Sequence, residues 1–273
     1  MTNLQNGNYV YYVKCSDAAS NVNSDDYTIS FTVSQQPGNY RRLVIINNRQ
    51  NPSVLSDYQI PITIDTNSLI SAGKMRSDCG DIRFTDSDGS TQLSYWLESG
   101  CNTASTKIWV KVPSIPASST KTIYVHYGNP SATSVSNARN TMFIYEDMET
   151  APSGTLAGNA TYDSTNKWVR LTPASRDQLG YLYYDKNPGS LGFYSKFRFW
   201  VGGGNGADAV WLGVYDSSYS NTHEDIVNGG YHFTYDEYQD RICFTKSTGG
   251  NGGPTIGCGS ETTIDNSAWH TGE

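Results

Sequence analysis

The sequence has few charged residues and no long apolar run. Asp, Glu, Lys and Arg make up 16% of the 273 residues, and the formal net charge is −7. Because nucleic acids and anionic membranes are bound by clustered Lys and Arg, this balance disfavours both as partners. No apolar stretch approaches the roughly 18 residues that span a bilayer, so we expect no membrane insertion. The N-terminal MTNLQNGNYV also lacks the basic and apolar regions of a signal peptide.

Motifs of common enzyme classes are missing as well. His126, His223, His232 and His270 have no Gly-x-Ser-x-Gly partner. The stretch TDSDGS, residues 85–90, begins like a calcium loop, but no glutamate follows at the required spacing. Asp-Gly at a strand junction predicts a tight turn instead. We therefore expect no enzymatic activity.

The residues that are abundant favour an all-β protein of the secreted type. The chain has 20 tyrosines and 26 glycines, and short alternating segments are separated by Gly, Asn and Ser turns. One short helix is predicted over residues 66–74 and ends at Gly73. The predicted strands are 8–14, 26–33, 41–47, 58–65, 81–86, 92–98, 107–112, 121–128, 167–173, 180–186, 193–201, 208–215, 230–240 and 241–246.

Two cysteines flank a predicted hairpin around DSDG. Partners across one hairpin have position numbers with a nearly constant sum. Cys79 and Cys101 have almost the same sum as Phe84 and Tyr95, so each pair should lie opposite, and the cysteines should be close enough to bridge.

A second pair follows the same rule. Cys243 and Cys258 flank the turn-rich GGNGGP, while Cys15 has no nearby partner. Two disulfides would indicate an oxidising compartment, and the alternative is five unrelated buried thiols. The orphan cysteine and the missing signal together suggest an internal piece of a longer exported protein.

The first unit, residues 1–36, holds two predicted strands, which are too few for a core. The stretch NGNYVYYVKCSDAASNVNSDDYTISFTV resembles the last two strands of an immunoglobulin-like or fibronectin-like module of bacterial and archaeal surface proteins. This resemblance implies either a module that was cut or strands that complete a sheet in a neighbouring copy.

The second unit, residues 37–138, contains six short strands and predicts a β-sandwich. The pattern YRRLVI, DYQIPITIDTNSLISAGKM, DIRFTDSDG, YWLES and KIWVKVPSIPASSTKTIYVHYGNPSA resembles an uncharacterised domain family common in archaeal and bacterial surface proteins. The family has no established chemistry, so the resemblance implies a fold and a location but no site.

The third unit, residues 139–273, contains GGGNGADAVW at 202–211 between two predicted strands. A phosphate-binding glycine loop needs a helix after it, so a nucleotide site is disfavoured. The stretches FYSKFRFWVGGGNGADAVWLGVY and NGGYHFTYDEYQD resemble the concanavalin A-like jelly roll of legume lectins. The predicted architecture is thus tandem β-sandwiches with a C-terminal concanavalin A-like jelly roll.

This resemblance implies a sugar site. In the family an aspartate after a cis Ala-Asp bond accepts hydrogen bonds from sugar hydroxyls, and the matching residue is Asp208, although Ala209 replaces the usual glycine. The amides of Gly229 and Gly230 would donate hydrogen bonds. An apolar plate would come from Tyr231 or Trp211, although alternation also allows Trp211 to be a core residue.

The resemblance also suggests a metal site. Asp236, the carbonyl of Tyr238, and Asp240 would hold calcium, while Thr234 stands where the family has an acid that serves a transition metal. The alternative is that the two aspartates are solvent-side residues of a hairpin. They are roughly 13 Å apart at about 3.3 Å per residue, too far for a glycosidase pair.

The functional expectation is an extracellular cell-surface protein that mediates adhesion by binding a glycan or glycoprotein surface. The alternative is a structural or filament-forming surface protein without a sugar site, which self-associates through β-strand complementation by its N-terminal strands.

Overall fold

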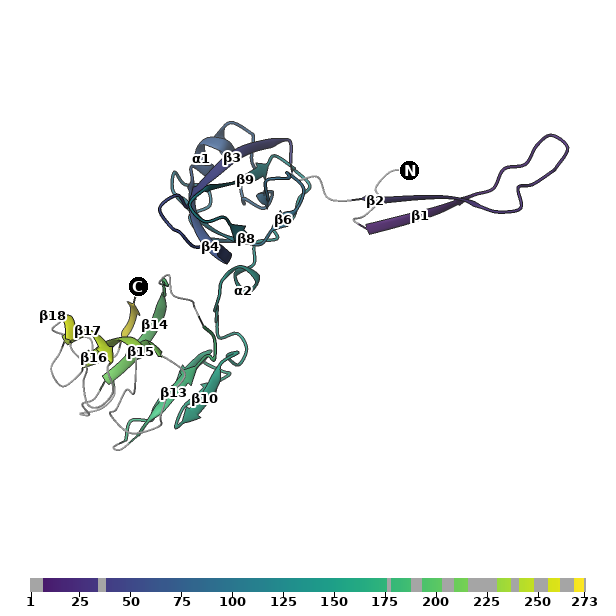
Figure 1. Ribbon diagram of the computed structural model, residues 1–273. Coiled ribbons are helices and arrows are strands. Elements are labelled where there is room, and N and C mark those ends of the chain that lie inside the picture. The colour runs from purple at the N-terminus through teal and green to yellow at the C-terminus, as the bar shows by residue number, and fades with distance from the viewer. Residues whose placement is uncertain are drawn as a thin grey trace. The chain divides into compact units, whose positions relative to one another are not determined.

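The computed structural model describes residues 7–33, 38–175, 178–187, 193–202, 209–215, 230–236, 241–247, 255–260 and 268–272. The chain divides into two compact units, Met1–Tyr145 and Glu146–Glu273. Regular structure is almost entirely antiparallel β-strand, as Figure 1 shows, so the predicted all-β class is confirmed. No helix among these residues is long and apolar enough to cross a membrane.

The N-terminal strands form a two-stranded hairpin. Strand β1 (Gly7–Val13) pairs with β2 (Tyr27–Val33) along the full length of both strands. The register places Tyr11 opposite Ile29 on one face of the ribbon, and the Tyr11 and Phe31 rings stack with centroids 5.7 Å apart on the same face. Cys15, just beyond β1, is exposed and free.

Residues 40–127 form a β-sandwich of two antiparallel sheets. One sheet has the order β3 (Tyr40–Asn47), β9 (Thr120–Tyr127), β5 (Arg83–Thr85) and β6 (Gln92–Leu93). The other has the order β4 (Leu55–Ile64), β8 (Thr106–Ile115) and β7 (Tyr95–Ser99). Strands β3 and β4 are therefore edge strands.

The sandwich core lies between these sheets because alternate apolar residues point inward. Phe84 is 1% exposed and Ile108 and Ile123 are 0% exposed. The Phe84 ring lies 5.4 Å from that of Tyr95, whose hydroxyl donates a 2.7 Å hydrogen bond to the Ile82 carbonyl. The one buried hydroxyl of this aromatic pair thus has an acceptor, which keeps the core free of an uncompensated polar group.

The predicted short helix is present as α1 (Thr66–Ser71). The Asp65 side chain caps it by accepting a 3.0 Å hydrogen bond from the Ser68 amide. Gly73, at φ 65°, follows the helix and donates to the Ile70 carbonyl at 2.9 Å. The helix and its closing glycine agree with the sequence prediction, and the Asp65 cap is an additional local signal.

A second helix, α2 (Ala138–Thr141), packs on the sandwich after its last strand. Asn137 caps it, and the Asn137 amide donates to the Tyr95 carbonyl at 2.9 Å. The Tyr145 ring lies 5.2 Å from that of Trp96 on β7. The N-terminal compact unit ends at Tyr145. The domain boundary predicted between residues 138 and 139 stays a prediction.

The TDSDGS stretch forms a turn between β5 and β6. The Asp86 amide donates to the Thr91 carbonyl at 2.8 Å, and Gly89 has φ 74°. The Asp88 carboxylate accepts hydrogen bonds from the amides of Ser90 and Thr91, each at 2.9 Å. Both observations agree with the turn predicted there.

The predicted register of this hairpin is wrong, although the disulfide that it suggested is confirmed. Phe84 pairs with Leu93, and Tyr95 pairs with Val110 in the opposite sheet. The chain passes from one sheet to the other at Ser94. Leu93 and Tyr95, on either side of it, are both buried in the core, the first from β6 and the second from β7. Cys79 and Cys101 are bridged with Cα atoms 6.0 Å apart.

The second unit contains several small antiparallel sheets. The strands are β10 (Thr155–Gly158) paired with β13 (Gly180–Tyr183), β11 (Thr161–Asp163) paired with β12 (Trp168–Arg170), β14 (Phe197–Val201) paired with β19 (Ala268–Gly272), and the four-stranded order β15 (Ala209–Tyr215), β16 (Gly230–Asp236), β17 (Arg241–Ser247) and β18 (Thr255–Ser260).

The predicted second disulfide is also confirmed. Cys243 on β17 is directly opposite Cys258 on β18, and the two are bridged. Two disulfides are typical of proteins that fold in an oxidising environment, which indicates the extracellular side. Nearby, Val201 is 5% exposed and packs against Phe199, Val210 and Ile242, which joins β14 to the four-stranded sheet.

Candidate functional site

Two exposed tryptophans lie side by side on the second unit. Trp200 on β14 is directly opposite Trp269 on β19. Their side chains are 44% and 45% exposed, and none of the other four tryptophans of the chain reaches this exposure. Because burying an aromatic side chain is strongly favourable, two adjacent exposed indoles mark a surface that packing alone does not explain.

Alternation along the two strands sets this exposure. Phe199 and Val201 point to the opposite face, where Val201 is buried and the Phe199 ring lies 5.5 Å from the His270 ring. Trp200 and Trp269 therefore occupy the outer face of the same sheet. The pair is held by backbone pairing on five consecutive rungs, from Phe197 opposite Gly272 to Val201 opposite Ala268.

Two further side chains extend this surface. The Arg198 guanidinium lies 5.1 Å from the centre of the Trp269 ring, a cation–π distance. Trp168, on β12, places its ring 5.7 Å from that of Trp269 at an angle of 42°. We name the set of Trp168, Trp200, Trp269 and Arg198 the tryptophan platform.

The tryptophan platform combines an apolar plate with a cationic donor group. Indole faces pack against the C–H faces of sugar rings, and a guanidinium offers several N–H donors in a fixed plane. Trp200 and Trp269 lie on paired strands rather than on a loop, so the plate that they form is present before a ligand binds. A flat ligand with hydroxyl or carboxylate groups at its edge fits this chemistry.

The sugar-binding residues predicted from sequence lie on a different sheet. Trp211 is opposite Thr234, and Tyr231 is opposite Val214, so the two aromatic residues occupy opposite faces of the four-stranded sheet. They cannot form one plate together. Gly230 begins β16, while Asp208 and Gly229 lie outside the described residues.

Tyr231 nevertheless belongs to a second aromatic patch. It is 43% exposed, stacks on Phe244 with centroids 5.8 Å apart, and has the Lys246 ammonium 5.8 Å above its ring. Phe233, 40% exposed, lies 4.8 Å from Phe244. Trp211 is half-buried on the opposite face, together with the buried His232 and Cys243, the first with its pKa lowered by burial.

The predicted metal residues fall partly outside the described chain. Asp236 ends β16 directly opposite Ala209, the residue that follows Asp208 in sequence. The register thus brings Ala209 and Asp236 to one end of the four-stranded sheet, whereas Gly230, opposite Tyr215, lies at the other end, so the predicted sugar residues do not converge within the described chain. Tyr238 and Asp240 lie outside the described residues, within which no group of three or more His, Cys, Asp or Glu side chains suits a metal ion.

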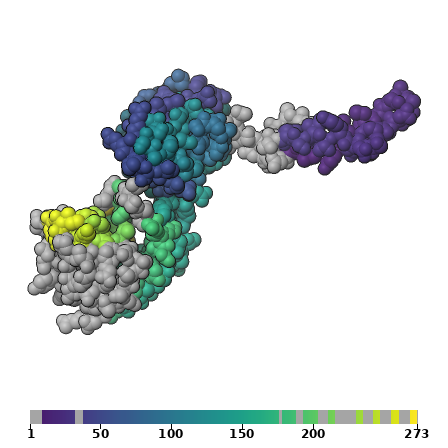
Figure 2. Space-filling view, in the orientation of Figure 1, coloured from purple at the N-terminus to yellow at the C-terminus, as the bar shows by residue number. Residues whose placement is uncertain are grey.

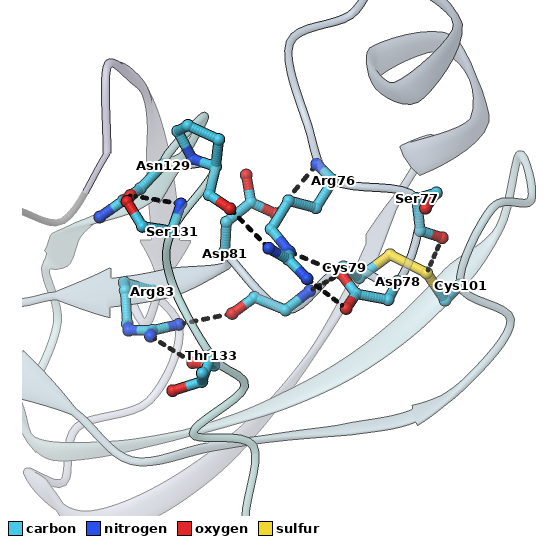
Figure 3. A network of polar contacts seen from close by, with 12 residues as sticks. Arg76, Ser77, Asp78, Cys79, Asp81, Arg83, Cys101, Asn129, Ser131 and Thr133 are labelled. Atoms are coloured by element: carbon cyan, nitrogen blue, oxygen red, sulfur yellow. Dashed lines mark hydrogen bonds and ion pairs between the residues drawn. A yellow bond between two sulfur atoms is a disulfide. The ribbon is translucent and has the colours of Figure 1, made fainter.

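A separate polar network surrounds the Cys79–Cys101 disulfide of the sandwich (Figure 3). Arg76 binds Asp78 through two hydrogen bonds of 3.0 and 2.8 Å, which hold the pKa of Asp78 well below its usual value. Asp81, fully buried, accepts hydrogen bonds from the Arg76 and Gly128 amides at 3.2 and 2.6 Å. Each carboxylate therefore holds one segment of chain in place.

Arg83 continues this network (Figure 3). It is 3% exposed and donates to the carbonyls of Gly80, Ile82 and Thr133 at 3.0, 2.6 and 2.6 Å. Because Arg83 is on β5 and Thr133 follows β9, this hydrogen bond holds the segment after β9 against the sheet. This arrangement fits a structural role, because the charged groups are engaged by the protein itself.

Sequence reasoning missed the tryptophan platform. The alternation in FRFWV and AWHTG could have placed Trp200 and Trp269 on outer faces, but nothing in the sequence pairs β14 with β19. Of the four histidines, His126 lies on β9, is 5% exposed and is hydrogen-bonded to the Thr85 hydroxyl at 2.9 Å.

Comparison with known families adds one finding. Residues 78–170 match DUF2341, a domain of unknown function. The match begins in the network of Figure 3 and ends at the last residue of β12, so it covers parts of both compact units. It supports the uncharacterised domain that the sequence pattern predicted. No curated protein and no solved structure matches the chain.

Proposed function

We propose that this protein binds carbohydrate through the tryptophan platform and thereby mediates adhesion at a cell surface. The observation that carries the proposal is the directly opposed, exposed pair of Trp200 and Trp269 on β14 and β19. When the C–H face of a sugar ring packs on such a plate, apolar surface of both partners is removed from water, which favours binding.

Arg198 suggests the kind of sugar. Arg198 is exposed and its guanidinium lies 5.1 Å from the centre of the Trp269 ring, so a sugar that stacks on the neighbouring Trp200 ring would lie beside this cation. A carboxylate would gain a charge-assisted hydrogen bond there. We therefore expect acidic glycans, such as those with uronic acids, to bind more tightly than neutral ones.

The extracellular location supports this proposal. The two disulfides suit an oxidising compartment, where glycans are exposed on cell surfaces. The concanavalin A-like resemblance of residues 139–273 adds the expectation that this unit is a lectin. Weak single-site binding would be multiplied on a surface that carries many copies.

A glycan array with the fluorescently labelled protein tests the function, with calcium and with a chelator. Hits are then titrated by isothermal titration calorimetry, because a double tryptophan variant has lost the two indoles whose fluorescence would report binding. We expect binding to be reduced at least tenfold in Trp200→Ala/Trp269→Ala. Tyr231→Ala is the matched comparison, since Tyr231 is exposed to nearly the same fraction on the four-stranded sheet of the same unit.

The outcomes separate the two candidate sugar sites. Loss of binding in Tyr231→Ala or Asp208→Ala, with the tryptophan double variant unaffected, would move the site to the four-stranded sheet. A requirement for calcium would likewise favour the predicted residues Asp236, Tyr238 and Asp240. An array without any hit in either condition would contradict carbohydrate binding altogether.

A further inference from the structure

An apolar groove runs along one side of the β-sandwich, between the edge strands β3 and β4. Its volume is about 320 Å³, and its walls come from residues 42–44 and 62–65 of the two edges. Leu69, Met75 and Tyr127, all buried core residues, form its floor. The groove therefore reaches residues of the sandwich core between these two strands.

The two strands that border the groove have unused backbone edges in the described chain. Strand β3 pairs with β9 only, and β4 pairs with β8 only. Five β-branched residues on these strands point toward the core and are only partly buried; they are Val44, Ile46, Ile60, Ile62 and Ile64. A sandwich that leaves this row half covered has room for one more strand.

Beyond Arg41 and Arg42 at its start, the β3 edge has none of the usual protection against strand addition. It pairs with β9 over eight unbroken rungs, without proline or bulge, and carries the apolar run 43–46. The outward side chains of Leu43 and Ile45 are 54% and 63% exposed. Natural edges of this length are normally blunted by charge, proline or a bulge, as Pro61 does on β4.

The N-terminal hairpin of the same chain has an apolar face that no other strand of the described chain covers. One face of the N-terminal hairpin presents Tyr11, Val13, Tyr27, Ile29 and Phe31, and the last three are 72%, 45% and 38% exposed. In the space-filling view the hairpin, residues 7–33, is a narrow ribbon (Figure 2). A two-stranded ribbon is at best marginally stable in water, so this face needs a cover.

We propose that the hairpin of one molecule adds to the open β3 edge of a second copy and inserts alternate side chains into the groove. The lengths agree, since β2 has seven residues and β3 has eight. Charge agrees as well. The hairpin has three aspartates and one lysine, whereas β3 begins with the exposed pair Arg41 and Arg42.

The donor is a second copy because the molecule's own hairpin is led away from this edge. Gly38 lies against β9, where an added Cβ would overlap the Tyr127 carbonyl, and the β9 backbone is on the opposite side of β3 from the unpaired β3 edge. Five Cα-to-Cα steps, at most about 18 Å of chain, join Val33 to Gly38. In the described chain β1 and β2 pair only with each other, so the molecule's own hairpin leaves the β3 edge to a second copy.

Sedimentation velocity over a wide concentration range tests the proposal. Cys15, the free thiol among five cysteines, is alkylated first so that disulfide-linked dimers do not form. We expect reversible oligomers for the wild type, and at least a tenfold weaker association for Ile29→Lys/Phe31→Lys. Thr28→Lys/Ser30→Lys is the matched control, because these residues lie on the other face of the same strand.

A peptide of residues 26–33 provides a second readout. It should bind the Ile29→Lys/Phe31→Lys protein and protect β3 amides from hydrogen exchange, whereas the peptide with both lysines should not. Monomeric wild type with unprotected β3 amides would overturn the proposal. Monomers with protected β3 amides would show that the hairpin fills its own groove, which also contradicts the second copy. Oligomers that survive both lysines would place the interface elsewhere.

Discussion

The β-sandwich and the C-terminal unit use similar residues in opposite ways. In the sandwich, fifteen apolar residues form one buried cluster that joins two sheets. In the described part of the C-terminal unit, the cluster around Val201 has one fully buried member, while Trp200, Trp269, Tyr231 and Phe233 are exposed. Aromatic side chains thus stabilise the first region and are available for contact in the second.

This contrast tells us where to look for function. A ring that fills a core is explained by packing, whereas rings displayed in register on paired strands are not. The disulfides show the same difference. One bridge anchors the buried network beside the sandwich core, and the other joins two neighbouring strands of a half-covered sheet.

The largest effect should come from emptying the sandwich core. Phe84→Ala removes a 1% exposed ring from the cluster and should lower the free energy of unfolding by about 3–5 kcal/mol. Phe233→Ala, on a 40% exposed ring, should cost about 1 kcal/mol, mainly its contact with Phe244. Urea unfolding measures both. Equal losses would show that the second unit has a core as dense as the first.

Removing either disulfide should cost a similar amount. The bridges close loops of 22 and 15 residues, which corresponds to about 3 kcal/mol each if the loss is that of loop closure. Cys79→Ser/Cys101→Ser should leave the sandwich folded on its core, whereas Cys243→Ser/Cys258→Ser should unfold β17 and β18. Hydrogen exchange resolves the two regions. Cys15→Ser, at an exposed free thiol, should change neither.

Acid should weaken the sandwich through His126. Burial and the nearby Arg41 charge lower the pKa of His126 below its usual 6.5, so the unfolded chain takes up the proton first. Stability from this group is therefore complete above about pH 6.5 and is lost as the pH falls through that value toward the folded pKa. The melting temperature should fall from pH 7.5 to pH 5.

His126→Gln should reduce this dependence for the sandwich alone. His232, whose pKa is also lowered by burial, should produce the same dependence in the second unit, and His232→Gln provides the comparison there. A pH profile of the sandwich that is unchanged by His126→Gln would show that another group titrates.

The smallest effect on stability should come from the platform. Arg198→Ala removes an exposed cation–π contact with Trp269 and should change the free energy of unfolding by about 0.5 kcal/mol or less. Its effect on acidic glycan binding should be much larger, because the charge-assisted contact is lost. A large loss of stability with unchanged binding would make Arg198 a structural residue.

The local features of the fold were predictable because their causes are local. Alternation located most of the strands, although β10, β11 and β18 were not among those predicted, and Gly73 follows the short helix as expected. The position-sum rule found Cys243 and Cys258, which are true cross-strand neighbours. The same rule found Cys79 and Cys101, although it gave the wrong partner for Phe84, which pairs with Leu93. A disulfide requires only that two Cα atoms lie within several Å of each other, whereas strand pairing requires one particular register.

The candidate site was less predictable. Trp211 and Tyr231 both seemed able to form a sugar plate, and only the pairing with Thr234 and Val214 shows that they occupy opposite faces. The tryptophan platform depends on strands that lie far apart in the sequence. Alternation states which side of its own strand a residue occupies, but not which strand will lie beside it.

From the sequence alone we could establish the acidic charge and predict the β-strand class and the two pairs of cysteines, and the structure confirmed the class and the bridges. These properties follow from side-chain period, spacing and composition. Only the tertiary structure decided that Trp200 meets Trp269, that β3 and β4 leave a groove open, and that the chain changes sheets at Ser94. Each of these depends on which distant strands exclude water together, and that choice is made by the whole core.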